Sequence, residues 1–426
     1  MRPDLSLKKA LKHDAEDAIR EYRSAFFHSE EDLIYLDGNS LGRLPKQTTS
    51  LLHEEITNAW GTRLIRSWNE EWIGLPQRLG GKLANLIGAA PNEVLFADAT
   101  SVNLYKLAHA AMKAQYPRQE IISDTLNFPS DLYILQGVLD QFPGAPSLQL
   151  VSSNNDIDIS LHEIRKKISQ NTALVSLSLV TYKSAYLYPM KEVTAAAHDA
   201  GALVLWDLSH AAGAVEIDLH DAGVDLAVGC SYKYLNGGPG APAFLYVSQS
   251  LQQSLESPLK GWFGDARPFA FESDYIPAEG IQRFSVGTPP ILSLAAIEPG
   301  LDLLNKVGMS AIRLKSQNLQ SYLLELFNHR LENLGFTLGS PIDPERRGSH
   351  VSLQHSFAGQ ICQALIDPGE GQSVIIPDYR APNSIRLGLT PLYTSFQDIW
   401  TAVDRMVQIM ETKEYLKFPE KPVGVT

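Results

Sequence analysis

Short apolar runs alternate with helical patterns through the middle of the chain. The apolar runs are rich in Val, Ile, Leu and Phe with little polar alternation, which is typical of strands covered on both faces. They are Glu93–Ala97, Glu120–Ser123, Leu148–Ser152, Thr172–Val180, Ala202–Leu208, Val224–Gly229 and Ala243–Val247. Helical spacing occurs between them, in Val102–Lys113, Asp131–Leu139, Leu161–Ile168 and Met190–Ala200. This alternation of strand and helix patterns predicts an α/β fold with a mostly parallel central sheet flanked by helices.

The alternation of apolar runs with helical patterns ends near Thr288. Two long helical patterns follow, Ile291–Lys306 and Ser310–Leu334. Beyond them are short strand candidates and further helices, at His350–Leu353, Phe357–Leu365, Ser373–Ile376, Ile385–Leu389 and Ser395–Thr412. This mixture predicts a smaller α+β domain. We expect a large domain over residues 49–300 and a small domain formed by residues 1–48 and 301–426.

Length and charge narrow the classes of partner. The chain has 426 residues, enough for two domains, and a net charge of −12 with no run of Lys and Arg. Nucleic acids and anionic membranes attract clustered basic residues, so we expect neither as a partner. A local site for one small anion remains compatible with this charge.

The cysteines and the N-terminal residues indicate whether to expect disulfides, a metal site or a signal peptide. The two cysteines, Cys230 and Cys362, have neither a CxxC partner nor zinc-ligand spacing, so we expect no disulfide framework and no metal site. Charged residues interrupt the apolar residues of the N-terminus, which disfavours a signal peptide, and no apolar run reaches membrane-spanning length. We therefore expect a cytoplasmic protein.

The strongest candidate for chemistry lies between residues 202 and 243. The strand pattern ALVLWDLSH carries Asp207 and His210 at its end, and the segment VDLAVGCSYKYLNGGPGA places Lys233 in a Gly-rich turn. An acid at a strand end lies where α/β sheets bind ligands. A lysine that forms a catalytic imine needs its charge suppressed by burial or by neighbours. Each residue alone is more often a capping acid or a surface lysine, but together they favour a covalent cofactor site.

The string CSYKYLNGGPGA at 230–241 resembles the kynureninase family of fold-type I enzymes, which depend on pyridoxal 5′-phosphate (PLP). Further segments match this family in the same order: LDGNSLGRLP at 36–45, GTRLIRSWNEEW at 61–72, FPSD at 128–131, GWFGD at 261–265, GTPPIL at 287–292, RRGSHVSL at 346–353 and APNSIRLGLTPLYTSF at 381–396. The family forms homodimers and hydrolyses L-kynurenine to anthranilate and L-alanine. The resemblance therefore implies a homodimer with active sites near the subunit interface.

The resemblance also implies which residues hold PLP. Lys233 would bind it as a Schiff base, and Asp207 would keep its pyridine nitrogen protonated so that the ring can accept electrons from Cα. The other implied cofactor contacts are Thr100, Ser101, Phe128, Asp131, Ser178, His210, Tyr232, Trp262 and Thr288. Of these, Trp262 and Thr288 are candidates to reach the site from the partner subunit.

Residue type alone leaves several of these assignments open. Thr100 and Ser101 stand between a strand and a helix, where hydroxyls and free N–H groups bind anions but also simply cap the helix. Phe128 is equally compatible with core packing, Asp131 with helix capping, and His210 with packing in a loop.

Four residues are implied in substrate binding. Arg386 lies in the strand pattern IRLGL, where an inward guanidinium needs an anion such as a carboxylate, although an edge-strand surface Arg is the alternative. Ser40 and Gly42 match a loop that closes over the substrate, although a simple turn would look the same. Trp68 matches an aryl-contacting position that is a histidine in some family members. The indole favours kynurenine over its 3-hydroxylated form.

The reaction that the resemblance implies breaks the Cβ–Cγ bond of L-kynurenine, a step of tryptophan degradation. The Lys233 amine would remove the α-proton, and water would add to the γ-carbonyl before the bond breaks. Tyr232 is the candidate proton donor, so Lys233, Tyr232 and Asp207 form the implied catalytic set.

Two alternative functions occur among proteins with the same fold. A cysteine desulfurase or selenocysteine lyase that uses a thiol needs it on an exposed mobile loop, but Cys362 lies in the apolar helical pattern GQICQALI. A non-catalytic protein that senses or scaffolds would be expected to have lost the lysine, the acid or the arginine, and this chain has all three.

Overall fold

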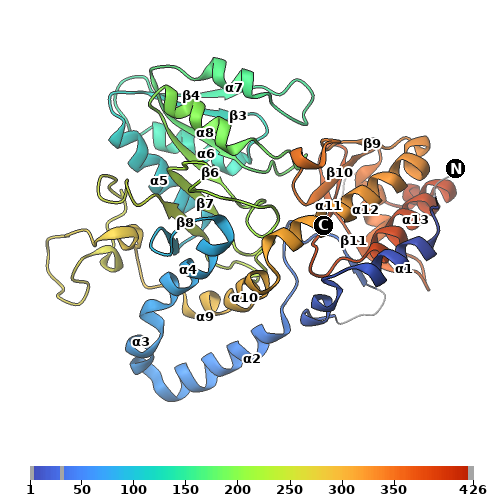
Figure 1. Ribbon diagram of the computed structural model, residues 1–426, viewed down its shortest axis with the longest axis horizontal. Helices are drawn as coiled ribbons and strands as arrows, with labels where there is room; N and C mark the ends of the chain where they lie inside the picture. The colour runs from blue at the N-terminus through green and yellow to red at the C-terminus, as the bar shows by residue number, and fades with distance from the viewer. Residues whose placement is uncertain (1–3, 29–32, 421–426) are drawn as a thin grey trace.

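A seven-stranded sheet forms the centre of the larger part of the molecule (Figure 1). The computed structural model describes residues 4–28 and 33–420. The strand order is β2-β8-β7-β6-β5-β3-β4, and β8 runs antiparallel to both of its neighbours while the rest run in one direction. The bounds are β2 Val94–Phe96, β3 Glu120–Asp124, β4 Ser147–Val151, β5 Thr172–Ser178, β6 Leu203–Asp207, β7 Leu226–Gly229 and β8 Phe244–Val247. All seven predicted strands are present, and the mostly parallel sheet is confirmed.

Helices cover both faces of this sheet, as the apolar strands require. Helices α5 (Thr100–Ala114) and α6 (Pro129–Leu139) share one core with Ile121 and Leu205. On the other face, Ile122 and Trp206 belong to a core that includes side chains of the three helices α4 (Leu75–Ile87), α7 (Leu161–Lys167) and α8 (Met190–Asp199). Neighbouring strand residues therefore point into opposite cores, and Trp206 is fully buried.

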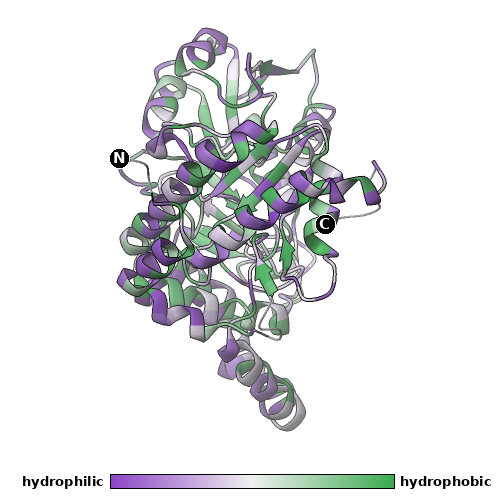
Figure 2. Cartoon of the chain, turned by 90° about the vertical axis from the view of Figure 1, so that its right-hand side faces the viewer, coloured by the Kyte–Doolittle hydropathy of each residue, from purple (hydrophilic) through white to green (hydrophobic). Residues whose placement is uncertain are grey.

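A helical arm leads from the N-terminal segment to α4. It consists of α2 (Lys46–Glu54), a π-helical stretch Glu55–Arg63, a short turn Leu64–Arg66 and α3 (Ser67–Glu70). The arm projects from the body of the molecule at the lower edge of Figure 1, and Figure 2 shows a helical projection at the same edge from the side. The sequence pattern did not predict these helices.

The predicted helix over residues 291–306 is divided in two. Helix α9 (Ile291–Ala295) ends before α10 (Glu298–Val307) begins, and Pro299 lies in the first turn of α10. A proline lacks the N–H that would bond back to Ala295, and its ring clashes with that carbonyl. The second predicted helix begins as α11 (Met309–Leu326) and continues as a π-helical turn, Phe327–Leu331.

The C-terminal part contains a second, antiparallel sheet in the order β12-β13-β10-β9. Its strands are β9 Thr337–Leu338, β10 His350–Gln354, β12 Asp378–Arg380 and β13 Ser384–Gly388. Helices α12 (Ala358–Ile366) and α13 (Phe396–Thr412) contribute, with α11, to a separate hydrophobic core.

The N-terminal segment packs on this C-terminal part. Strand β1 (Leu33–Tyr35) pairs in parallel with β11 (Val374–Ile376), and α1 (Leu7–Glu16) lies against α13. Leu301 and Leu304 of α10 pack in the core of the larger sheet. The division into domains at residues 48 and 300 stays a prediction.

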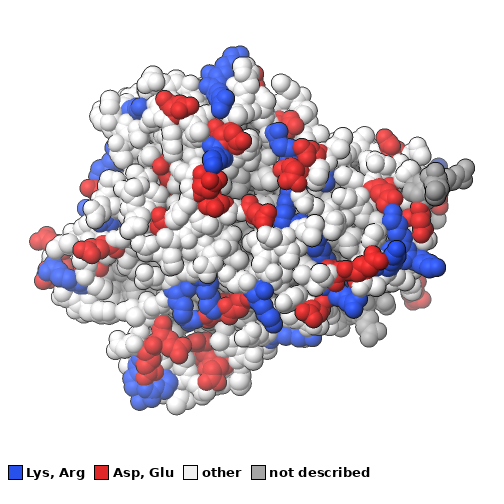
Figure 3. Space-filling view, in the orientation of Figure 1, with Lys and Arg blue, Asp and Glu red and all other residues white. Residues whose placement is uncertain are grey.

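The surface carries both signs of charge. On the face shown in Figure 3, Lys and Arg are interspersed with Asp and Glu. Among residues 4–28 and 33–420, no helix has the length and apolar character that a bilayer span needs.

Candidate active site

The carboxyl ends of β5, β6 and β7 gather the chemistry-bearing residues of the large sheet. Ser178 ends β5 and lies opposite Asp207, which ends β6. Lys233 follows β7 in a turn that Asn236 closes, with the Asn236 N–H donating to the Lys233 carbonyl at 3.0 Å. Parallel strands bring their carboxyl ends to one edge, so residues from three separate segments meet there.

The Lys233 amine contacts a histidine. Its Nζ lies 2.9 Å from Nε2 of His210, which is buried. Burial, and then the nearby Lys233 charge, hold the pKa of His210 well below its usual value, so the imidazole is neutral at physiological pH. With Nε2 accepting from Lys233, the ring proton is on Nδ1, which finds no hydrogen-bond partner in the described part of the chain.

Two buried carboxyl groups lie side by side near the lysine. Asp207 accepts a hydrogen bond from the Ser209 N–H at 2.7 Å, and Asp131 is 3% exposed in the first turn of α6. Burial and the neighbouring Asp207 raise the pKa of Asp131 well above its usual value. A buried acid pair of this kind favours a cationic N–H donor as its ligand, because a donor relieves the repulsion between the carboxylates.

Tyr232 precedes the lysine in the chain and lies close enough to these acids for their charges to act on its hydroxyl. The Lys233 Nζ is 5.9 Å from the centre of the Tyr232 ring. The adjacent Cys230 thiol, then burial, and the Asp207 and Asp131 charges raise the pKa of Tyr232 above its usual value. The phenol therefore keeps its proton at physiological pH and can donate it.

Two helix N-termini meet beside this group. Ser101, in the first turn of α5, has its Oγ 3.1 Å from the Oγ of Ser130, in the first turn of α6. Among the described residues, no side chain caps α5 at Ala99, so the first N–H groups of that helix are free for an anion. Thr100 and Ser101 are both partly exposed. A phosphate fits this position.

An aromatic side chain stands next to the same helix. Phe128 precedes α6, is 43% exposed, and meets the Tyr182 ring edge-on with centroids 5.3 Å apart. Asn127 fixes its surroundings, because the Asn127 Oδ1 accepts from the Phe128 N–H at 2.8 Å and from the Ser178 hydroxyl at 2.7 Å. Together with Lys233, the acid pair and the helix N-termini, an exposed ring here fits PLP.

Arg386 is buried in β13, with 1% of its surface exposed. Its Nε and one Nη both contact the Asp378 carboxylate, and that Nη also lies 3.1 Å from the Ser40 hydroxyl. The other Nη donates to the Tyr182 carbonyl. Asp378 thus holds one edge of the guanidinium. The Nη edge faces the Ser40 loop and Tyr182, whose ring contacts Phe128. The structure therefore brings Arg386 and Ser40 together.

Gly42 packs beneath the lysine turn. Its N–H donates to the Tyr232 carbonyl at 2.8 Å, and a Cβ at this position would lie 2.3 Å from the Lys233 carbonyl oxygen. Only glycine allows so close an approach. Gly42 thus supports the backbone of the turn that carries Lys233.

Three predicted residues lie in other surroundings. Trp68 and Trp262 both contact Phe263, with ring centroids 6.0 and 4.5 Å apart, respectively. Thr288 is exposed in the loop before α9. The structure joins the two tryptophans to each other through Phe263, and the predicted roles of all three residues stay predictions.

Sequence reasoning missed four residues of this region, namely Asn127, Tyr182, His350 and Asp378. His350 is fully buried in β10, with its ring 5.4 Å from that of His210. Burial and Arg386 lower its pKa well below the usual value. The sequence held no signal for His350, because its contact with His210 joins two segments that are far apart in the chain.

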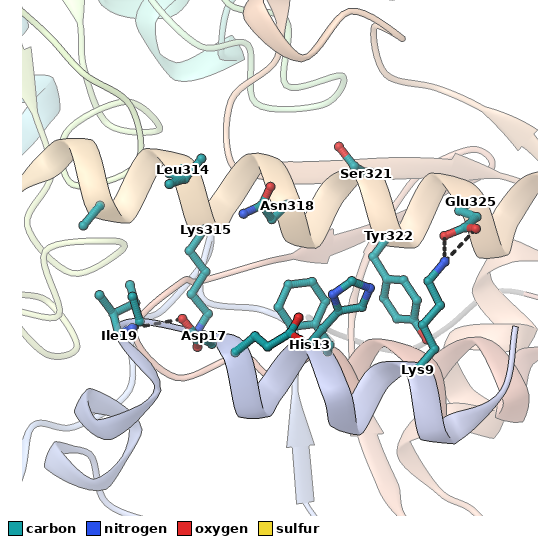
Figure 4. Close-up of a pocket in the computed structure, with 14 residues that line it drawn as sticks. Lys9, His13, Asp17, Ile19, Leu314, Lys315, Asn318, Ser321, Tyr322 and Glu325 are labelled. Carbon is teal, nitrogen blue, oxygen red and sulfur yellow. Dashed lines mark hydrogen bonds and ion pairs between the residues drawn. The ribbon is translucent and has the colours of Figure 1, made fainter. Parts of the chain in front are cut away.

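A cavity of about 580 Å³ lies elsewhere, between α1 and α11 (Figure 4). Four of its charged groups form two pairs, Lys9 with Glu325 at 2.6 Å and Lys315 with Asp17 at 2.7 Å. These pairs leave little unmatched charge for a ligand. The chemistry gathers around Lys233 instead.

Comparisons with known proteins show the family of the chain. The family model "Kynureninase C-terminal domain" matches residues 312–406. A kynureninase of Pseudomonas fluorescens is 44% identical over 407 residues, which are 94% of this chain and 95% of that protein. A kynureninase of Burkholderia pseudomallei is 42% identical over 413 residues, 96% of each chain.

Solved structures show the fold. A cysteine desulfurase from Thermococcus onnurineus NA1 superposes with a TM-score of 0.75, covering 97% of this chain and 99% of that one at 18% identity. At 18% identity this similarity shows a shared fold and nothing about function. The two kynureninases match this chain almost from end to end at more than 40% identity. The chain therefore belongs to the kynureninase family.

Proposed function

We propose that this chain is a PLP-dependent enzyme that hydrolyses the Cβ–Cγ bond of L-kynurenine, giving anthranilate and L-alanine in tryptophan degradation. The observation that carries the proposal is the group around Lys233: an amine on a neutral imidazole, beside two buried carboxyls, at the carboxyl edge of the sheet. Full-length relatives named kynureninase support the same reaction.

Each residue has a proposed task. Bound PLP supplies an electron sink for the bond-breaking steps. Lys233 holds the cofactor and then moves the α-proton, and Asp207 holds the proton on the pyridine nitrogen with Asp131 beside it. Tyr232 donates a proton to the alanine fragment after the bond breaks, and its raised pKa keeps that proton on the phenol at physiological pH until then.

Other residues position the reactants. Thr100 and Ser101 bind the phosphate, Phe128 covers the ring, and Arg386 binds the substrate carboxylate. The remaining proposed cofactor contacts are Ser178, His210, Trp262 and Thr288. The buried pairing of Arg386 with Asp378 supports its task, because a fixed guanidinium presents two N–H donors in the geometry of a carboxylate.

A cysteine desulfurase function finds no support in the thiols. Cys230 and Cys362 are both buried, and burial raises the pKa of both above the usual value. A reactive thiol needs the opposite, exposure and a lowered pKa.

We further propose a cytoplasmic homodimer of two-domain subunits. Apolar side chains of the arm support the dimer, since Ile56, Trp60, Leu64 and Ile65 are between 46% and 76% exposed. Exposed apolar patches of this kind mark interfaces. In such a dimer Trp68, Trp262 and Thr288 would be available to the partner's site, and Trp68 would favour kynurenine over its 3-hydroxylated form.

The test is an assay of the purified protein with L-kynurenine. We expect anthranilate fluorescence and alanine to appear in equal amounts. The same assay with 3-hydroxykynurenine and with L-cysteine is the comparison. Release of sulfide from cysteine without anthranilate from kynurenine would overturn the proposal.

A further inference from the structure

Two carboxylates lie beside the buried guanidinium of Arg386. Asp378 faces it across the β12–β13 pair and accepts from its Nε, with both side chains almost fully buried. The second is Asp37, in the segment that runs along β13. Asp37 pairs with Gly388, two residues from Arg386, and the Gly388 N–H donates to the Leu36 carbonyl at 2.6 Å.

The two acids differ in how well they are satisfied. Asp378 bonds directly to Arg386. Asp37 is 7% exposed, and its Oδ1 has no hydrogen-bond partner within residues 4–28 and 33–420. Burial first, and then the Asp378 charge, raise the pKa of Asp37 to about 6, while Ser40, Arg386 and Arg380 act in the opposite direction.

The other titratable groups around Asp37 are neutral. They come from β1, the lysine turn, α12 and the loop before α13, and they are Tyr35, Tyr234, Cys362 and Tyr393. Burial raises the pKa of each, that of Tyr393 to about 12. Near neutral pH, Asp37 is therefore the group of this cluster that is poised to change its charge.

We propose that Asp37 takes up one proton from solvent when a substrate carboxylate binds to Arg386, while Asp378 stays ionised and fixes the guanidinium. This rests on the proposed function in one respect, namely that Arg386 is the carboxylate-binding residue. A bound substrate brings a third carboxylate to the same buried guanidinium. Like charges in a buried site disfavour a further ionised carboxyl, and Asp37 is the one whose oxygen lacks a donor.

Affinity should then depend on pH. Below about pH 6 Asp37 is already protonated, so binding takes up no proton. Above that value binding takes up as much as one proton, and affinity falls by up to about tenfold per pH unit. The fall ends at the pKa that Asp37 has in the complex.

The holoenzyme and a non-reacting probe test this. The probe is 4-(2-aminophenyl)-4-oxobutanoate, which keeps the carboxylate and aryl ketone of kynurenine but has no α-amine to react. Calorimetry in two buffers of different ionisation enthalpy measures the protons taken up at a pH about one unit above the pKa of Asp37. We expect close to one proton in the wild type and in Asp140→Asn, a control at an exposed position, and close to none in Asp37→Asn.

Either of two results overturns the proposal: no uptake in the wild type, or the same uptake in Asp37→Asn. Should that variant fail to fold, infrared difference spectra of the wild type replace it. Binding of the probe should produce the carbonyl band of a newly protonated carboxyl group. Its absence refutes the proposal.

Arg386→Lys separates this proposal from the one on which it rests. Loss of bidentate geometry should weaken the probe roughly 10- to 100-fold. An unchanged affinity places the carboxylate site elsewhere and overturns both proposals. A weakened affinity in Arg386→Lys without proton uptake in the wild type overturns only the role of Asp37.

Discussion

The proton positions around Lys233 follow from burial. His210 is neutral because an imidazolium next to the lysine would be desolvated and repelled, and Tyr232 keeps its proton because acidic neighbours disfavour a phenolate. Burial, and then the neighbouring Asp207, raise the pKa of Asp131 and favour its protonated form. These protonation states are the ones that the proposed roles need, an acid pair for a pyridine nitrogen and a protonated phenol as a proton donor.

Asp207→Asn tests the acid pair. An amide keeps the shape of the side chain but cannot hold the pyridinium proton as a carboxylate does, so we expect PLP to stay bound while turnover is largely abolished. Absorbance titration with PLP measures cofactor binding, and the anthranilate assay measures turnover. Near-normal turnover would assign the electron-sink role to another residue.

Tyr232→Phe tests the proton donor. The ring is kept and the proton is lost, so turnover should fall roughly 10²- to 10⁴-fold. The loss should affect steps after Cβ–Cγ cleavage, and the early absorbance changes on mixing with substrate should survive. Rapid-mixing spectra at saturating PLP check this. Full recovery of turnover on adding PLP would leave Tyr232 as a phosphate ligand only.

At the scale of elements, the hydrophobic pattern predicted the strands of the large sheet more accurately than the break in a helix and the short strands elsewhere. The seven strands of the large sheet are short, mostly apolar runs, which the sequence displays directly. Pro299 divides a helical pattern that apolar spacing alone made continuous. Strands β1 and β12 have three residues each, too few for a periodic signal. Strand β1 is held by pairing with β11, which lies far along the chain, and β12 by a hairpin with the neighbouring strand β13.

The same distinction applies to the site. Lys233 and Asp207 could be found because they follow strands within one short stretch of sequence. Asp378 and His350 could not, because pairing with β13 brings Asp378 to Arg386, and the docking of β10 brings His350 to His210. Neither contact leaves a trace in sequence spacing.

The loop at Gly42 is the element-scale test. A Cβ at Gly42 would overlap the Lys233 carbonyl, so Gly42→Ala should lower the free energy of unfolding by roughly 1–3 kcal/mol and weaken PLP binding. Gly137→Ala is the control, because that exposed glycine of α6 has open space around its Cβ position and alanine favours a helix. Denaturant unfolding of both variants provides the comparison. A Gly42→Ala protein as stable as the control would show that the turn adapts without strain.

At the scale of the whole molecule, the arm carries large apolar side chains that none of the three cores covers. Ile65 is 76% exposed and Trp60 is 56% exposed. If the arm forms the dimer interface, the double variant Ile65→Asp with Trp60→Asp should sediment as a monomer while the wild type sediments at twice the chain mass. A double variant that remains dimeric would place the interface on another surface.

The identity of the cofactor lysine is the most direct test of the account. The purified protein should be yellow, and borohydride should fix a pyridoxyl group to one lysine. Peptide mass mapping should locate that group at Lys233, which is the lysine that contacts His210 at the carboxyl edge of the sheet. A pyridoxyl group on any other lysine, or on none, would contradict it.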